Sequence, residues 1–114
     1  MTALLERAAE NHAILSMHAI DLGEVYYDCI RVDGERIADE MLDAIEALPL
    51  AVVWDIDKPM LKIAATMKTK HKMSYADCFA AALTVRQRSH LVSTDRKEFG
   101  PLAEANVIQV YWLR

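Results

Sequence analysis

Short apolar segments alternate with longer segments of helical period along this chain, and this alternation restricts its fold more than any other feature. The segments with strand character are 13–17, 51–56, 90–95 and 106–113, and those with helical character are 2–12, 19–32, 34–50, 57–72, 74–89 and 96–105. Segment 51–56 is continuously apolar except for Asp55, which is typical of a strand covered on both faces. Strands that alternate with helices predict an α/β fold with a mainly parallel sheet covered by helices.

Length and composition favour one globular domain. The chain has 114 residues, of which 54% are hydrophobic and 26% are charged, and this balance excludes a disordered chain. No apolar run approaches the roughly 18 residues that span a membrane, and the first residues lack the apolar centre of a signal peptide. Cys29 and Cys78 lack the spacing of metal ligands, so we expect two buried thiols in a cytoplasmic protein.

The two halves of the chain differ strongly in charge. Residues 1–57 contain thirteen acidic and three basic side chains, a formal charge of −10, whereas residues 58–114 contain four acidic and ten basic ones, a formal charge of +6. One explanation is that a basic face meets a polyanion while an acidic face meets a basic partner. The other is that the two halves attract each other.

Three carboxylates stand out against their apolar surroundings. Asp77 follows Ser74 by three residues, so Ser74 and Asp77 form a capping-box pattern at the start of a helix. Asp77 also shares a helical face with small residues that pack closely on a sheet, which suits a binding site equally well. Asp95 follows an apolar strand and has the same two interpretations, whereas Glu24 shares its helix face with Ile20 and Tyr27 and needs a partner if that face is buried.

Carboxylates on separate elements, without a His or Cys ligand set, suit a hard divalent cation such as Mg²⁺ or Mn²⁺ rather than zinc. Such an ion lowers the pKa of a bound water molecule and neutralises charge that develops on a phosphoryl group. Hydrolysis of a phosphodiester is therefore the chemistry that these residue types favour.

Three motifs together resemble a known family. They are G-E-V-Y-Y at 23–27, S-Y-A-D-C-F-A-A-A-L at 74–83 and L-V-S-T-D-R-K-E-F at 91–99, and they are similar to PIN-domain ribonucleases, especially the VapC-type toxins of toxin–antitoxin pairs. The resemblance implies a three-layer α/β/α fold with a mainly parallel sheet. It also implies that Glu24, Asp77 and Asp95 bind the metal ion and carry catalysis, with Thr94 as a polar contact beside them.

The chain departs from the family pattern at its start. Family members begin with an apolar strand that ends in Asp and lies at the centre of the sheet, whereas this sequence begins at the helix that follows. We therefore expect residues 1–114 to form a single, N-terminally truncated PIN-like domain that lacks the first metal-binding Asp. Either the flanking strands pair directly or a second copy of the chain fills the gap, as in a homodimer.

The resemblance predicts a metal-dependent endoribonuclease, the toxin of a toxin–antitoxin pair, with RNA as substrate and an antitoxin protein as partner. Lys70, Lys72 and Arg96 are candidate contacts for the RNA backbone, with Arg86 among the basic residues nearby. The lysines alternatively complement a helix dipole without binding RNA. The alternative function is a degenerate, non-catalytic PIN-like module that binds an antitoxin or associates with itself.

Overall fold

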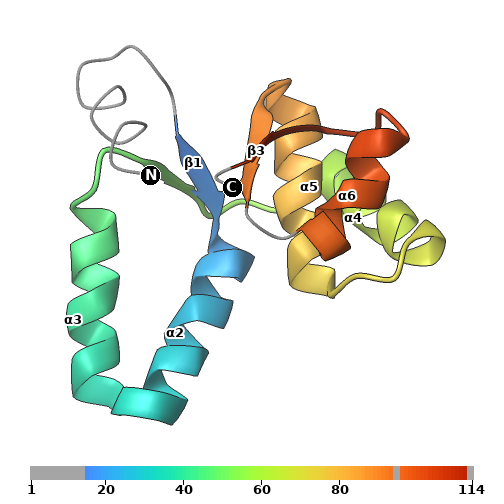
Figure 1. The fold of residues 1–114 in the computed structure, drawn as a ribbon. Helices are drawn as coiled ribbons and strands as arrows, with labels where there is room; N and C mark the ends of the chain where they lie inside the picture. Colours follow the sequence, from blue (N-terminus) through green and yellow to red (C-terminus); the bar gives the residue numbers. More distant parts are fainter. Residues whose placement is uncertain (1–14, 94–95, 113–114) are drawn as a thin grey trace. The chain divides into compact units, whose positions relative to one another are not determined.

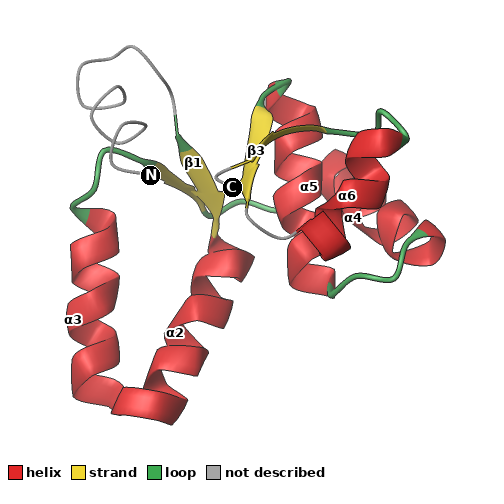
Figure 2. Ribbon diagram, viewed as in Figure 1, coloured by secondary structure: helices red, strands yellow, loops and turns green. Residues whose placement is uncertain are grey.

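The computed structural model describes residues 15–93 and 96–112, and its elements follow one another as strands and helices (Figures 1 and 2). The predicted helix at 2–12 lies outside the described residues, as do Thr94 and Asp95. The chain divides into two compact units, Met1–Asp55 and Ile56–Arg114.

The first unit contains two strands and a pair of helices. Its elements are β1 (Ser16–His18), α2 (Ala19–Asp33), α3 (Glu35–Glu46) and β2 (Ala51–Val53). β1 and β2 pair in parallel, with Ser16 opposite Ala51 and His18 opposite Val53. Helices α2 and α3 pack side by side as a hairpin (Figure 1), and Gly34 adopts the positive φ of 89° that the turn between them requires.

The second unit places three helices beside another parallel strand pair. Its elements are α4 (Lys58–Lys70), α5 (Tyr75–Gln87), β3 (His90–Ser93), α6 (Arg96–Glu104) and β4 (Gln109–Trp112). β3 pairs with β4, with His90 opposite Gln109. Helix α5 is the centre of the core, because its small buried residues allow α4 to approach closely. The buried residues of α5 are Ala76, Cys78, Phe79, Ala81, Ala82, Leu83 and Thr84.

Side chains at the helix starts explain why α4 and α5 begin where they do. Asp57 Oδ1 accepts a hydrogen bond of 2.9 Å from the Met60 amide, and Ser74 Oγ accepts one of 3.1 Å from the Asp77 amide. Each bond satisfies one of the amide groups that the first turn of a helix leaves free. The cap by Ser74 was predicted from the sequence, and it is confirmed.

The predicted fold class is confirmed, with two local corrections. Helices alternate with strands, and both described strand pairs are parallel. The expected strand over 51–56 ends at Val53, opposite His18, the last residue of its partner β1. It is also not covered on both faces. Ala51 is exposed, and Trp54 beyond the strand is 63% exposed. Cys78 is fully buried as expected, whereas Cys29 is half-buried.

Candidate functional site

The predicted carboxylates lie on different elements. Glu24 is half-buried in α2 of the first unit, and Asp77 is half-buried in the first turn of α5 in the second unit. The third, Asp95, lies outside the described residues together with the predicted polar contact Thr94. Within residues 15–93 and 96–112, no group of three or more His, Cys, Asp or Glu side chains is placed to hold a metal ion. The site residues therefore stay predictions.

The structure separates the two roles suggested for Asp77. Ser74 caps α5 with its hydroxyl oxygen, so the start of the helix is explained by Ser74 and by the Asp77 backbone amide. Among the described residues, none forms a hydrogen bond or an ion pair with the carboxylate of Asp77. Its face continues into Ala81 and Thr84, which are both buried. The carboxylate of Asp77 therefore lies at the edge of a closely packed face.

The turn between α4 and α5 carries the predicted RNA contacts. Lys70 ends α4 and Lys72 lies in the turn, and both side chains are exposed. Lys68 has a different role, because its Nζ donates a hydrogen bond of 2.6 Å to the carbonyl oxygen of Met73 and so holds the turn. Arg96 is the first residue of α6, and its side chain lies outside the description.

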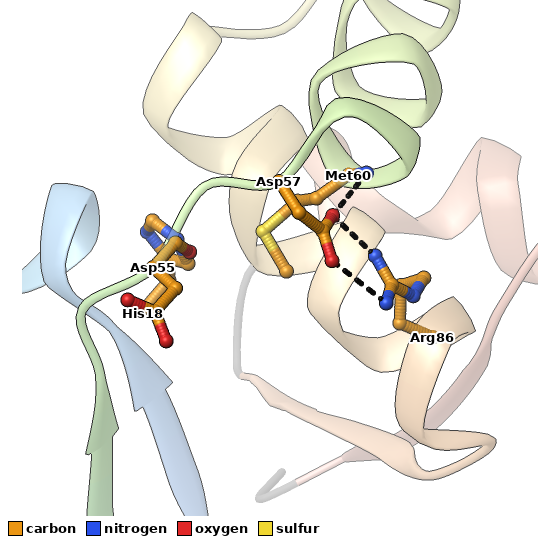
Figure 3. A network of polar contacts seen from close by, with 5 residues as sticks. All are labelled: His18, Asp55, Asp57, Met60 and Arg86. Carbon is orange, nitrogen blue, oxygen red and sulfur yellow. Dashed lines mark hydrogen bonds and ion pairs between the residues drawn. The ribbon is translucent and has the colours of Figure 1, made fainter.

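Arg86 forms an ion pair with Asp57, a residue of the same unit (Figure 3). Its Nη1 and Nη2 lie 2.6 and 3.0 Å from Asp57 Oδ1 and Oδ2, a bidentate ion pair between the end of α5 and the start of α4. The hydrogen bonds from Arg86, followed by that from the Met60 amide, lower the pKa of Asp57, and Asp57 raises the pKa of Arg86 in turn. The interpretation of Arg86 as part of an RNA-steering cluster is therefore weakened.

His18 is a buried polar residue that the sequence analysis missed. Its side chain is 1% exposed, and its Nδ1 accepts a hydrogen bond of 3.1 Å from the Ile20 amide, which caps α2. Its Nε2 lies 3.1 Å from the carbonyl oxygen of Asp55 and donates to it (Figure 3). These two roles require a neutral ring with the proton on Nε2. His is not among the preferred N-cap residues, so the local sequence carries little signal for this bond.

Tyr26 links the two helices of the first unit. Its hydroxyl donates a hydrogen bond of 2.6 Å to Asp39 Oδ1, from α2 to α3. This bond, followed by slight burial and the nearby negative charge, raises the pKa of Tyr26. The bond fixes the helix that carries Glu24 against its neighbour.

Comparison with known proteins agrees with the motifs. The family model described as PIN domain matches residues 2–104, a range that includes Glu24, Asp77 and Asp95. No curated protein and no solved structure matches the chain. The helix-rich chain with its small parallel sheets is consistent with the three-layer α/β/α fold predicted from the resemblance. Among the described helices, none is both long enough and apolar enough to cross a membrane.

Proposed function

This chain belongs to the PIN domain family, and from that premise we propose that it is a metal-dependent endoribonuclease that hydrolyses RNA phosphodiester bonds. PIN domains are generally nucleases, they bind RNA, and they usually use divalent metal ions. The observation that carries the proposal for this chain is Asp77, whose carboxylate stands beside a helix start that Ser74 already caps. The Ser74 cap explains the start of α5 without the Asp77 carboxylate, whose negative charge also interacts favourably with the helix N-terminus.

We assign metal binding to Glu24, Asp77 and Asp95. Their oxygen atoms suit Mg²⁺ or Mn²⁺, and a bound ion supplies an activated water and neutralises charge on the scissile phosphate. The sequence resemblance implies one more Asp at the end of a preceding strand.

The RNA backbone is proposed to contact Lys70 and Lys72, with Thr94 and Arg96 on the following segment. The exposure of both lysines at the turn that leads into Asp77 supports this assignment. Each phosphate contact on a single strand releases counterions, so binding weakens with salt with a slope of about −0.7 per contact in a log–log plot. Lys70→Gln together with Lys72→Gln is therefore expected to reduce the salt slope by about 1.4.

The biological setting is proposed to be a toxin–antitoxin pair in the cytoplasm. The exposed acidic side chains of α3, which include Asp39, Glu40, Asp43 and Glu46, suit a basic antitoxin segment. A homodimer of this chain completes the proposal. Binding of an antitoxin-like protein without RNA cleavage would favour the alternative function, a non-catalytic PIN-like module.

RNA cleavage by the full chain tests the proposal directly. Single-stranded RNA is incubated with the protein in Mn²⁺, in Mg²⁺ and in EDTA, and the products are separated by gel electrophoresis. We expect cleavage in either metal ion and none in EDTA. Asp77→Asn should abolish it, whereas Asp43→Asn, which neutralises an exposed carboxylate of α3, should not. Full activity of Asp77→Asn, or equal cleavage in EDTA, would overturn the assignment.

A further inference from the structure

An exposed aromatic residue lies at the start of α5, next to the turn that carries two exposed lysines. Tyr75 is the first residue of α5, and it is 44% exposed. Lys72 precedes it by three residues and Lys70 by five, so the three residues lie within six consecutive positions of the second unit. A single exposed aromatic residue is ordinary on a protein surface. An aromatic residue among exposed lysines is typical of surfaces that bind single-stranded nucleic acids.

The Tyr75 ring is supported by Phe79. The two rings meet edge to face, with 5.0 Å between their centroids and 60° between their planes. Phe79 is 3% exposed and belongs to the core, so it gives the Tyr75 ring a firm support. Because this contact uses one face or one edge of the Tyr75 ring, and the residue is almost half exposed, ring surface is left for a ligand.

The backbone around Tyr75 is held by its own hydrogen bonds. Lys68 Nζ donates one of 2.6 Å to the carbonyl oxygen of Met73, whose side chain is buried. Ser74 Oγ accepts one of 3.1 Å from the Asp77 amide. These bonds restrain the chain before and after Tyr75. A side chain that is held before binding loses little conformational freedom when it meets a ligand.

Positive charge lies close to the ring. Three residues of chain span at most about 11 Å, so the Cα atoms of Lys72 and Tyr75 lie within that distance of each other. Lys70 and Lys72 are both exposed, and no described residue forms an ion pair with either of them. A single strand carries a phosphate beside each base, so lysines next to an aromatic ring suit adjacent parts of one strand.

We propose that Tyr75 stacks on a base of the single-stranded RNA whose phosphates contact Lys70 and Lys72. This inference rests on the proposed function, which supplies the RNA, and adds a contact to a base. Positions 75 and 77 lie about 200° apart around the helix axis, so the stacked base flanks the reacting phosphate at Asp77. Every base has a flat face, so the contact favours unpaired RNA without selecting a sequence.

RNA binding by the full chain tests the stacking contact. A fluorescently labelled single-stranded RNA oligonucleotide is titrated with protein in EDTA, which prevents metal-dependent cleavage, and the Kd is measured by fluorescence anisotropy. Tyr75→Leu keeps an apolar contact with Phe79 and loses the ring. It is expected to raise the Kd by roughly 5- to 150-fold, the range for one base on an aromatic side chain, with an unchanged salt slope. Tyr75→Phe keeps the ring and should stay within about twofold of wild type.

An abasic oligonucleotide of the same length distinguishes stacking from a structural effect. It has the phosphates of the RNA and lacks the bases, so wild type and Tyr75→Leu should bind it equally. If Tyr75→Leu weakened the binding of both oligonucleotides by the same factor, Tyr75 would have a structural role and the stacking contact would be refuted.

The matched control is Tyr27→Leu. Tyr27 is 56% exposed on α2 of the first unit, and its sequence neighbours are Tyr26 and Asp28 rather than lysines. Tyr27→Leu is expected to leave the Kd for the RNA unchanged. An equal loss of RNA affinity in Tyr27→Leu and Tyr75→Leu would contradict a stacking contact at Tyr75.

The RNA cleavage assay, run on the same variants, separates this inference from the proposed function. Cleavage by wild type together with equal RNA affinity in wild type and Tyr75→Leu would overturn the stacking contact and leave the proposed function standing. Base-dependent binding through Tyr75 without cleavage in Mg²⁺ or Mn²⁺ would support the stacking contact and overturn the nuclease. Absence of RNA binding by wild type would overturn the stacking contact.

Discussion

Ser74→Ala is predicted to lower the unfolding free energy and to leave metal binding intact, whereas Asp77→Asn is predicted to abolish metal binding. The Ser74 hydroxyl accepts a hydrogen bond of 3.1 Å from the Asp77 amide, and Ser74 itself is exposed. Its removal exposes one first-turn amide to water and costs about 1 kcal/mol of unfolding free energy, the usual loss for a Ser cap. For a domain of this size that loss lowers the Tm by about 4 °C.

Asp77→Asn leaves the Ser74 cap and the side-chain volume in place and removes one negative charge from the first turn of α5, so without metal its unfolding free energy should stay within about 1 kcal/mol of wild type. The difference appears when metal is added. Mn²⁺ at about a hundred times its Kd stabilises a protein that binds it only when folded by about 2.7 kcal/mol. We expect this gain in wild type and in Ser74→Ala, and its absence in Asp77→Asn.

Thermal denaturation followed by circular dichroism, in EDTA and in Mn²⁺, distinguishes the two roles. Glu104→Gln, which neutralises an exposed carboxylate at the end of α6, serves as the control for a lost negative charge. If Asp77→Asn lowered the Tm in EDTA as far as Ser74→Ala did, and still responded to Mn²⁺ like wild type, then Asp77 would be a capping residue. The metal-ligand assignment would then be wrong.

Three further predictions concern the contacts that shape the two units. The pKa of folded Asp57 lies below its ordinary value of 3.8, so the stability from its pair with Arg86 is complete above that value and is lost as the pH falls through the folded pKa. In urea denaturation at a series of pH values, the stability advantage of wild type over Arg86→Gln should be constant near neutrality and vanish in acid. An advantage that persisted after Asp57 is protonated would contradict the ion-pair argument. The pKa of folded Tyr26 lies above its ordinary value of 10.0, so the stability from its bond to Asp39 is present below that value and is lost as the pH rises through the folded pKa. Tyr26→Phe should therefore be less stable than wild type at neutral pH and equal to it in strong alkali. An absorbance titration in which Tyr26 ionised at its ordinary pKa would contradict the bond. Phe79 is 3% exposed and meets the Tyr75 ring edge-on at 5.0 Å between centroids, so Phe79→Ala should cost about 3–5 kcal/mol in the same denaturation assay. A cost below about 1 kcal/mol would show that the site collapses without a cavity.

Local patterns were sufficient to predict the helix starts of the second unit. A cap depends on two residues three positions apart, and Asp57 and Ser74 belong to the residue types that accept this bond well. The start of α2 was predicted without its cap, because the capping bond there is accepted by His18. A histidine accepts this bond only when other contacts set its tautomer and its burial. Those contacts involve Asp55, 37 residues away.

Long-range partners account for what the sequence did not predict. The end of β2 depends on where β1 stops, so hydrophobicity alone extended the strand past Val53. Arg86 appeared to be available to RNA because its partner Asp57 lies 29 residues earlier, beyond the reach of any helical period. The candidate metal ligands Glu24 and Asp77 were selected by family motifs, since each taken alone has an ordinary structural explanation.

The contacts of the charged side chains show which part of the charge asymmetry is exposed on each unit. Divided at the boundary of the units, residues 1–55 hold twelve acidic and three basic side chains, and residues 56–114 hold five acidic and ten basic ones. In the first unit Arg31 and Arg36 bind carboxylates of their own helices, which leaves the excess of negative charge exposed on α3. In the second unit Arg86 and Lys68 are used to hold helix ends, whereas Lys70 and Lys72 are exposed. Exposed positive charge is therefore present at the turn before Asp77, and exposed negative charge is present on α3.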